Sequence, residues 1–587
     1  MTVSQRRGLF VVFEGIDGSG KTTLCHRVAT ELRQHGLTIT QVREQGRYSS
    51  AVTQSIRELG RDQRNLEMTA STELLLLLAR EVQLFEEATR PALEHSDLVL
   101  ADRFVYTAAV MAEHGRGLPD QRVRSIIHAV TGDLEPDLVV LVDVDPQLAR
   151  ARRKVAKLLG ADNQPSSRKG LAGAGLQHRV RDGYHALAER DPERWVVVDN
   201  SEASLALMQS AIVAGLLAAH RDGLAEGRRL LAERLNPGVL GARRPSARAR
   251  SLEEAGQHFL DWIDRRMVSE PDLAAYHLAG LSGPGIDQRR VALTTRSPAV
   301  IAHGLRGLAD ALAWRLRDAL AEVAPAEVAS SLLELPADDA DAMAMRRRLA
   351  AQAPAAVALS LLHCDDASAW TLRGQLHDGA PLEVLASLGG LSSARAWSWR
   401  ERFLMERGGE PALASYPIAD AMCRSLTGLD EPRAFALRER ASAVAPVSAI
   451  ASLTGSGSDA AHAWRTRYLL RAPRPVLKSL VGLDDEFSWT LREQSAEACK
   501  EAIGSLAGMD AAQAWQLRDR HRDRWPSAVA ASLGPTLAHT PPGAELLGYL
   551  LRQHPSVSVW RSAAAVLPAH AARLHDDTRR VAAAFAE

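Results

Sequence analysis

The stretch FEGIDGSGKTT, Phe13 to Thr23, decides the fold of the first part of this chain. It fits the pattern GxxxxGK[ST] from Gly15 to Thr22, follows the apolar run LFVVF (Leu9 to Phe13) and leads into a helical segment. Glycines in such a loop let successive backbone N–H groups point at a phosphate, and the positive end of the helix dipole adds to the attraction. The sequence therefore predicts a nucleotide phosphate-binding loop between a buried strand and a helix.

The side chains of this loop suit ATP and Mg²⁺. Lys21 supplies a mobile positive charge for the β- and γ-phosphates, and the Thr22 hydroxyl is placed to ligate Mg²⁺. Lys21 is informative because only six of the chain's 71 basic residues are lysines. The residues expected to bind the nucleotide are Gly15, Asp17, Gly18, Ser19, Gly20, Lys21, Thr22 and Thr23.

Apolar runs on either side of this loop predict a parallel sheet. Five short β-branched runs alternate with longer helical stretches, which is the pattern of a doubly wound α/β domain with helices on both faces. Runs this continuously apolar are buried on both faces of a sheet. The predicted strands are Leu9 to Phe13, Thr38 to Val42, Asp97 to Ala101, Asp137 to Val144 and Trp195 to Asp199.

Length and composition set limits on the rest of the chain. At 587 residues it exceeds the roughly 250 to 300 residues that one core supports, so we expect two or more domains. With 71 basic and 71 acidic residues, no global field draws the protein to nucleic acid or to an anionic membrane. Four cysteines without a CxxC pair, no signal peptide pattern and no apolar run of about 18 residues predict a cytoplasmic protein.

Beyond Ser297 the sequence repeats itself. A Trp, Phe or Met is followed three residues later by Arg, and a Ser-Leu pair marks the other half of each unit. A proline opens one helix of the unit, and the aromatic residue lies on a second, amphipathic helix. Such helix pairs share a continuous core when they stack, so we predict an all-α solenoid of about eight repeats. The residues that precede the arginine by three are Trp314, Met343, Trp370, Trp397, Phe435, Trp464, Trp489 and Trp515. The serines of the Ser-Leu pairs are Ser331, Ser360, Ser387, Ser425, Ser452, Ser479, Ser505 and Ser532.

Irregularities in the pattern place the boundaries. A Gly-, Pro- and Arg-rich stretch, Leu235 to Arg250, reads as a linker. We therefore expect a nucleotide-binding domain at 1–222, a linker or helical connector at 223–296 and the repeat domain at 297–587. One long interval between repeats predicts an insertion at Glu406 to Tyr416. The tryptophans could form a ligand surface, but at helical spacing we favour a packing role.

An acid and an arginine follow each of two predicted strands. Asp102 and Arg103 follow the third strand, and Arg43 and Glu44 follow the second. Ligands of open α/β sheets bind at the carboxyl ends of the strands. Phosphoryl transfer needs charge neutralisation and alignment there, so we expect these groups on the acceptor side of the site.

The order of the motifs resembles thymidylate kinase from Leu9 to about His220. The resemblance implies transfer of the γ-phosphate of ATP to a nucleoside monophosphate. It also leads us to expect a homodimer. We further expect a protein partner that binds the repeats. The stretches that carry it are FEGIDGSGKTT, VREQG (Val42 to Gly46), REVQLFEEATRPAL (Arg80 to Leu93), ADRF (Ala101 to Phe104), GRGL (Gly115 to Leu118), EPDLVVLVDVDPQLARAR (Glu135 to Arg152) and HRVRDGYHALA (His178 to Ala188).

The resemblance assigns roles to residues. Asp17 would face the acceptor, and Asp102 and Arg103 would contact its phosphate and the surroundings of the metal. Thr22 and Asp102 are the expected Mg²⁺ ligands. A lid at about 153–176 would bring a catalytic arginine, with Arg150, Arg152, Arg153 and Arg168 as candidates. The residues expected in catalysis are Lys21, Asp17, Asp102, Arg103 and Arg153, and those expected on the acceptor side are Arg43, Glu44, Arg103, Leu77 and Glu81.

The base-reading positions depart from the family pattern. Where the family has a Phe that packs on thymine and an Arg four residues later, this chain has Leu77 and Glu81, and Arg80 would face elsewhere on the helix. The family's Tyr-Gln pair aligns with Met111 and Ala112. We favour conversion of dTMP and ATP to dTDP and ADP. The alternatives are a nucleotide-sensing scaffold and a kinase with another small acceptor.

Overall fold

The computed structural model describes residues 8–43, 50–132, 134–161, 168–173, 175–201, 205–235, 248–336 and 338–565. They form two compact units. The first contains the described residues up to 154, then 168–169 and 175–235, and the second contains those of 155–161, 170–173 and 248–565.

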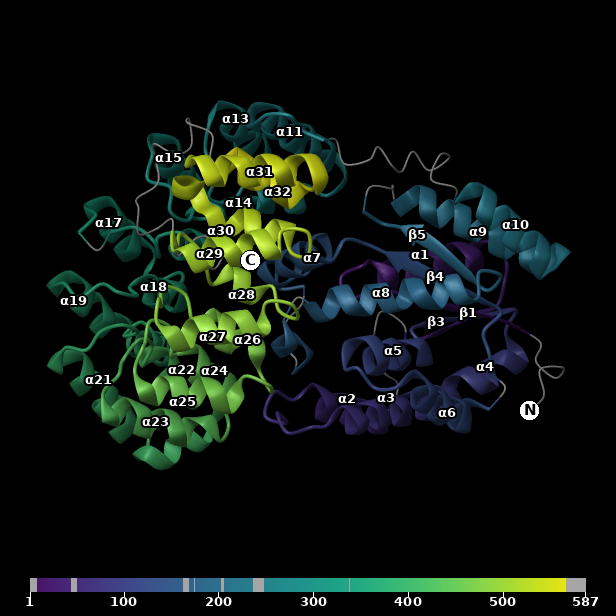
Figure 1. The fold of residues 1–587 in the computed structure, drawn as a ribbon, viewed down its shortest axis with the longest axis horizontal. Coiled ribbons are helices and arrows are strands. Elements are labelled where there is room, and N and C mark those ends of the chain that lie inside the picture. Colours follow the sequence, from purple (N-terminus) through teal and green to yellow (C-terminus); the bar gives the residue numbers. More distant parts are fainter. Residues whose placement is uncertain are drawn as a thin grey trace. The chain divides into compact units, whose positions relative to one another are not determined.

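The first unit is built on a five-stranded parallel sheet with the strand order β2-β3-β1-β4-β5 (Figure 1). The strands are β1 Leu9–Glu14, β2 Ile39–Val42, β3 Leu98–Asp102, β4 Leu138–Asp143 and β5 Trp195–Asp199. The central strand β1 pairs with both β3 and β4, and its side chains are almost all buried. The predicted doubly wound sheet is confirmed.

Helices cover this sheet. One face packs against α1 and α9 through a core that includes Leu24, Val28, Met208 and Ile212. The helical elements before residue 236 are α1 Lys21–Gln34, α2 Ala51–Arg61, α3 Ala70–Leu84, the π-helix η3 Phe85–Thr89, α4 Arg90–His95, α5 Val105–Val110, the π-helix η4 Met111–Gly115, α6 Asp120–Thr131, α7 Pro146–Leu158, the 3-10 helix η5 Arg168–Ala172, α8 Gly175–Arg190, α9 Leu205–Asp222 and α10 Leu224–Arg234.

The second unit contains helices throughout its described part beyond residue 250. Prolines open most of the short helices, where a missing N–H costs nothing. The elements are α11 Leu252–Ser269, α12 Pro271–His277, α13 Pro284–Leu293, α14 Pro298–His303, α15 Ala311–Leu320, α16 Pro325–Ser330, α17 Ala340–Leu349, α18 Pro354–Ser360, α19 Ala367–Leu376, α20 Pro381–Ala386, α21 Ala394–Met405, the 3-10 helix η6 Glu410–Ala414, α22 Tyr416–Ser425, α23 Pro432–Ser442, α24 Pro446–Ala451, α25 Asp459–Tyr468, α26 Pro473–Lys478, α27 Glu486–Ser495, α28 Glu501–Gly504, α29 Ala512–Arg520, α30 Pro526–Ala538, α31 Pro541–Gln553 and α32 Val557–Ala565.

Two details concern the predicted boundaries. Helices α11 to α13 occupy much of the region 223–296 and belong to the second unit. Most of the predicted linker Leu235 to Arg250 lies outside the described residues. The predicted insertion contains η6, directly before α22.

A buried arginine joins consecutive repeats. The eight repeat arginines are 0% exposed. Each Nε donates to the hydroxyl of the repeat serine at 2.9 to 3.3 Å, and an Nη donates to a leucine carbonyl in the preceding turn at 2.5 to 2.8 Å. In six repeats the guanidinium lies 4.7 to 4.8 Å from the centre of the aromatic ring three residues earlier. The rings therefore pack on these arginines, as predicted for a packing role. The predicted spacing is wrong in one repeat, where the buried arginine is Arg465, directly after Trp464. Arg467, three residues after Trp464, is instead 52% exposed and pairs with Glu439 at 3.2 Å. The arginines are Arg317, Arg346, Arg373, Arg400, Arg438, Arg465, Arg492 and Arg518.

A ninth arginine extends this pattern toward the N-terminal side. Arg290 is 2% exposed and donates to the carbonyl of Leu278 at 3.2 Å. The sequence pattern missed this unit because Asp287 stands in the aromatic position and Gly304 in the serine position.

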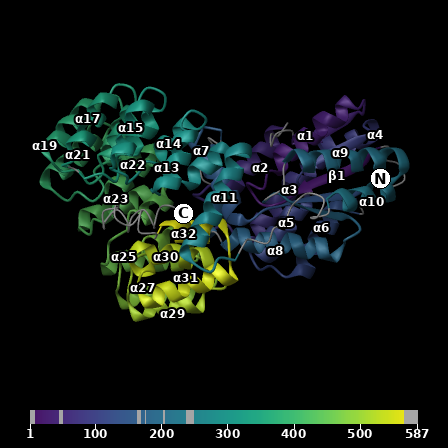
Figure 2. The same ribbon diagram turned by 90° about the horizontal axis from the view of Figure 1, so that it is seen from above.

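The stack of repeats closes on itself. Helix α32 packs against both α30 and α11, and α11 packs against α12, so the last helix meets the first (Figures 1 and 2). Arg561 of α32 donates to the carbonyls of His277 and Ala279 at 3.0 and 2.5 Å. An open solenoid needs polar end repeats to cover its apolar faces. Closure into a ring buries those faces instead.

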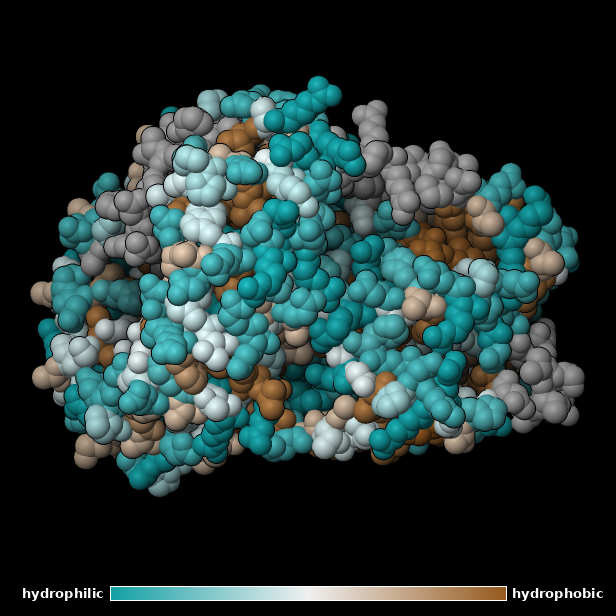
Figure 3. All heavy atoms as spheres, viewed as in Figure 1, coloured by the Kyte–Doolittle hydropathy of each residue, from teal (hydrophilic) through white to brown (hydrophobic). Residues whose placement is uncertain are grey.

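The surface of the molecule is mostly hydrophilic in the view of Figure 3, with apolar side chains gathered over β5 and α9. Val197 and Leu207 are 41% and 51% exposed there. Among the described residues, no helix is both long enough and apolar enough to span a membrane.

Candidate functional site

The phosphate-binding loop has the backbone shape that its glycines predict. Gly15, Gly18 and Gly20 have φ values of 143°, 90° and 89°. A Cβ at Gly15 or Gly18 would lie 2.4 Å from a backbone carbonyl oxygen, that of Val142 or Ala149. Only glycine fits both the torsion angle and the space.

Helix α1 begins at Lys21, so the loop delivers its lysine at a helix N-terminus. Lys21 is 6% exposed, and its Nζ lies 3.5 Å from the carbonyl oxygen of Ile16. Burial, together with the nearby Arg103, lowers the pKa of Lys21 to about 8. The hydroxyl of Ser19 is buried without a hydrogen-bond partner among the described residues, and Thr23 is exposed on α1.

Thr22 and Asp102 meet as the metal prediction requires. The Thr22 hydroxyl donates to Oδ2 of Asp102 at 2.6 Å, across 80 residues of sequence. Asp102 is 4% exposed, and its Oδ1 is buried without a hydrogen-bond partner in the described part of the chain. A hydroxyl beside a buried carboxylate with an unsatisfied oxygen fits a hard cation such as Mg²⁺.

Arg103 is held by several partners at once. It donates to Asp17, to the carbonyl of Gly15 at 3.0 Å and to the Thr107 hydroxyl at 3.0 Å. Burial alone would raise the pKa of Asp17, but Arg103, Lys169 and Lys21 lower it well below its usual range. Asp17 is thus an anion, and Arg103 a fixed cation.

A buried carboxylate that the sequence reading overlooked supports this arginine. Glu14 is 0% exposed, accepts from the hydroxyls of Thr107 and Tyr184 at 2.8 Å each, and lies 3.9 Å from Arg103. Burial raises its pKa, while Arg103 opposes that shift. Its place directly before Gly15, at the end of the buried strand β1, was the available signal.

The acceptor side differs from the sequence prediction in two respects. Arg43, with a φ of 60°, forms a buried ion pair with Glu81. Leu77 lines the pocket as expected, whereas Glu81 lies behind its wall. The prediction that Arg80 faces elsewhere is wrong, because Arg80 lines the pocket. Adjacent positions on a helix differ by about 100°, and a long arginine side chain can bend across that angle.

Two other predictions about this side have simpler outcomes. Glu44 lies outside the described residues. Met111 and Ala112 are each 3% exposed in η4, and neither lines the pocket.

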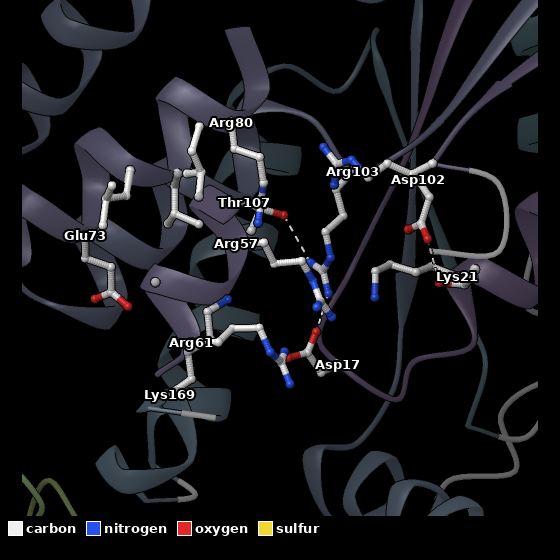
Figure 4. Close-up of a pocket in the computed structure, with 16 residues that line it drawn as sticks. Asp17, Lys21, Arg57, Arg61, Glu73, Arg80, Asp102, Arg103, Thr107 and Lys169 are labelled. Carbon is white, nitrogen blue, oxygen red and sulfur yellow. Dashed lines mark hydrogen bonds and ion pairs between the residues drawn. The ribbon is translucent and has the colours of Figure 1, made fainter. Parts of the chain in front are cut away.

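These residues surround one pocket with a volume of about 220 Å³. Arg57, Arg61 and Arg80 reach it from α2 and α3, opposite Lys21 and Asp102, with Arg103 and Asp17 between them (Figure 4). The sequence reading missed Arg57 and Arg61, although their spacing of four places both on one helix face. The lining residues are Asp17, Lys21, Thr22, Arg43, Ile56, Arg57, Gly60, Arg61, Glu73, Leu76, Leu77, Arg80, Asp102, Arg103, Thr107 and Lys169. Seven of them are basic and three acidic, so the pocket suits an anionic ligand.

Arg152 and Arg168, two of the four candidate lid arginines, have structural roles. Arg152 donates to the carbonyl of Asn200 at 3.1 Å, and the Asn200 amide donates to the carbonyl of Ser19 at 2.7 Å. Arg168 is 8% exposed and lies 2.6 Å from Glu73, which also accepts from Arg116 at 2.7 Å. Arg152 therefore supports the loop, and Arg168 anchors its segment to α3.

The remaining lid cations are Arg150, Arg153 and Lys169. Arg150 and Arg153 belong to α7, and the Cγ of Arg153 would lie 3.2 Å from a Cβ at Gly18. Among the described lid residues, Lys169 is the one that lines the pocket. Burial lowers the pKa of Lys169 to about 8, although Asp17 favours its charged form. The sequence reading passed over Lys169 because it considered arginines alone.

Comparison with known proteins yields one family. The sequence model of thymidylate kinase matches residues 13–212. The thymidylate kinase of Desulforudis audaxviator is 37% identical over 218 residues, which are 37% of this chain and 93% of that protein. That of Geotalea uraniireducens is 34% identical over 216 residues, 37% of this chain and 100% of that protein. A solved thymidylate kinase from Ehrlichia chaffeensis is 23% identical, covers 36% of this chain and 98% of that one, and has a TM-score of 0.27.

Proposed function

The chain belongs to the thymidylate kinase family, and we propose that it transfers the γ-phosphate of ATP to a nucleoside monophosphate, with dTMP as the favoured acceptor. The observation that carries the proposal is the convergence of Lys21, the Thr22–Asp102 pair and Arg103 on one basic pocket. The products would be dTDP and ADP.

The donor side follows from the loop. Its backbone N–H groups and the start of α1 would hold the phosphates of ATP, and Lys21 would draw off charge that develops on the bridging oxygen. Thr22 and Asp102 would hold Mg²⁺, which when bound would neutralise negative charge on the phosphates. Positioning and electrostatic stabilisation account for most of the catalysis in phosphoryl transfer.

The acceptor side follows from the arginines. Asp17, the Gly15 carbonyl and Thr107 fix the guanidinium of Arg103 before any ligand binds. A fixed cation needs no reorganisation when the acceptor's phosphate arrives. Arg57 and Arg61 on α2 would complete the cationic surface for this phosphate.

A lid cation would complete the site over the transferred phosphoryl group. Lys169 lines the pocket, whereas Arg153 lies beside Gly18 at the loop. We assign the contact with the transferred group to Lys169 and a contact with the donor phosphates to Arg153. Closing such a segment also excludes water and limits hydrolysis of ATP.

The first experiment is a coupled assay with purified full-length chain, Mg²⁺-ATP, and a panel of nucleoside monophosphates and nucleosides. Lys21→Met serves as the blank. Arg27→Met, which removes an exposed cation from the same helix, is the matched control. We expect Lys21→Met and Thr22→Val each to lower kcat by about 10²-fold or more, and Arg27→Met to leave it unchanged. If ATP binds and no acceptor is consumed, the kinase proposal fails, and a nucleotide-sensing scaffold replaces it.

The repeat ring would serve as an interaction domain for a protein partner in a cytoplasmic enzyme. Helical repeats offer extended surfaces that bind other proteins. Sedimentation equilibrium of the purified chain distinguishes a monomer from the expected homodimer, and affinity capture with the ring residues alone or the full chain tests for a partner.

A further inference from the structure

The lid segment passes from one unit to the other within a single peptide bond. Lys169 belongs to the first unit and lines the pocket, whereas Gly170–Gly173 belong to the second unit. The residue before Lys169 is anchored, because Arg168 lies 2.6 Å from Glu73 of α3. Consecutive Cα atoms are about 3.8 Å apart, so a contact that holds residue 170 also limits where Lys169 can lie.

Two segments of the repeat ring hold the backbone that follows Lys169. Arg474, on α26, donates from Nη1 to the carbonyl oxygen of Gly170 at 3.3 Å. The thiol of Cys499, just before α28, donates to the carbonyl oxygen of Ala172 at 3.5 Å. Cys499 is 3% exposed, so this second contact is buried. The ring therefore binds two backbone carbonyls of the lid.

Glu501 of α28 supports both contacts. Its side chain is 5% exposed, and its Oε1 lies 3.6 Å from Nε of Arg474. A Cβ at Gly173 would lie 2.7 Å from Oε2 of Glu501 and 3.1 Å from Sγ of Cys499. Gly173 also has a φ of 83°, a torsion angle that favours glycine. The backbone at Gly173 thus packs directly against the ring.

A glycine stands at each end of the held segment, at Gly170 and Gly173, and glycine has the largest conformational freedom to lose. Building on the proposed kinase function, we propose that Arg474 is a positioning residue for Lys169. Arg474 holds the Gly170 carbonyl, and this contact keeps the neighbouring lysine in the pocket. A cation that is already in place needs no reorganisation during the reaction. The repeat ring thereby takes part in catalysis through the lid backbone.

Steady-state kinetics of the full chain with Mg²⁺-ATP and dTMP test this role. We expect Arg474→Met to lower kcat by about tenfold, because Lys169 remains but is correctly placed for a smaller fraction of the time. The KM values for ATP and dTMP should change by less than about twofold, since the side chains proposed to bind these substrates are intact. Arg474→Lys keeps a charged donor and should restore kcat to within about threefold of the wild type. Arg520→Met, which removes a 56% exposed arginine paired with Glu493, is the matched control and leaves kcat unchanged.

A double-mutant cycle separates positioning of Lys169 from a general effect on the protein. If Arg474 acts through Lys169, adding Arg474→Met to Lys169→Met should lower kcat no further. A full additional tenfold loss in the double variant overturns the inference. A wild-type kcat in Arg474→Met overturns it as well.

Amide exchange distinguishes failure of this inference from failure of the proposed function, because it needs no turnover. We expect the amides of residues 169–173 to exchange about tenfold faster in Arg474→Met, with exchange in α1 unchanged. If no acceptor is converted but exchange rises in this way, the kinase proposal fails and the anchoring of the lid by the ring stands. Unchanged exchange overturns the anchoring. Thermal unfolding checks each fold, and Gly173→Ala, which would displace the same backbone, replaces Arg474→Met if the latter misfolds.

Discussion

Replacing Arg346 by methionine should destabilise the repeat ring although no ligand contact is lost. Arg346 lies on α17 and is 0% exposed. Its Nε donates to the Ser360 hydroxyl at 3.2 Å, and its Nη2 donates to the carbonyls of Leu332 and Ser360 at 2.8 and 3.1 Å. Methionine keeps the unbranched stem of the side chain and fills part of the space of the guanidinium.

The magnitude follows from these three bonds. Hydrogen bonds to a charged group contribute about 1.5–3 kcal/mol each. Burial disfavours the charged guanidinium and lowers the pKa of Arg346. Removing this buried charge therefore offsets part of the lost hydrogen-bond energy. We expect the free energy of unfolding to fall by about 3 kcal/mol for Arg346→Met, and by about 1–2 kcal/mol for Ser360→Ala, which removes one acceptor and leaves the donor buried.

Arg348 on the same helix provides the matched control. Its side chain is 45% exposed and pairs with Asp318 and Glu322 at 3.2 and 3.4 Å. Exposed pairs contribute at most about 1 kcal/mol, so Arg348→Met should have a small effect. Urea unfolding followed by tryptophan fluorescence gives the free energies, and amide exchange shows whether α16 to α18 open first. Equal losses for the two arginine variants would refute the view that the buried arginines tie the repeats together.

Three further predictions address the lid, the titration of a buried histidine and the ring closure. Lys169→Met should lower kcat by about 10²-fold, and Arg153→Met should chiefly raise the KM for ATP. In the wild type, kcat/KM should fall above about pH 8, where both Lys21 and Lys169 lose their charges. The reverse assignment of kcat and KM effects would show that Arg153 is the catalytic cation. Burial lowers the pKa of His277 to about 4, below its usual 6.5, so the unfolded state binds a proton at a higher pH than the folded state does. The contribution of this group to the free energy of unfolding is fully present above pH 6.5 and falls by about 3 kcal/mol toward pH 4. Urea unfolding of His277→Gln should lose this pH dependence. Arg561→Met should speed amide exchange in α11 and α32 by about tenfold or more, and unchanged exchange would show that packing alone closes the ring.

Much of the first unit could be predicted from the sequence because its signals are local. An apolar run such as Leu9 to Phe13 has few alternatives to a buried strand, and the torsion angles at Gly15, Gly18 and Gly20 exclude other residues. Even the meeting of Thr22 and Asp102 was predictable, because both follow parallel strands at the same edge of the sheet. The period of the repeats was likewise visible in the arginines and serines.

The direction of individual side chains was not predictable. Helical geometry placed Arg80 off the pocket, but a flexible side chain anchored by Glu81 reaches into it. Lys169 became a pocket residue because Arg168 ties its segment to Glu73. Such outcomes depend on partners far away in sequence.

The sequence by itself determined which elements form and the backbone shape of the glycine-rich loop, because periodicity and backbone torsion act over a few residues. Only the tertiary structure decided that the repeat arginines are buried, that Arg561 joins the last helix to the first, and that Arg80 and Lys169 line the pocket. The free energies of burial, charge pairing and ring closure depend on groups that the fold brings together from distant parts of the chain.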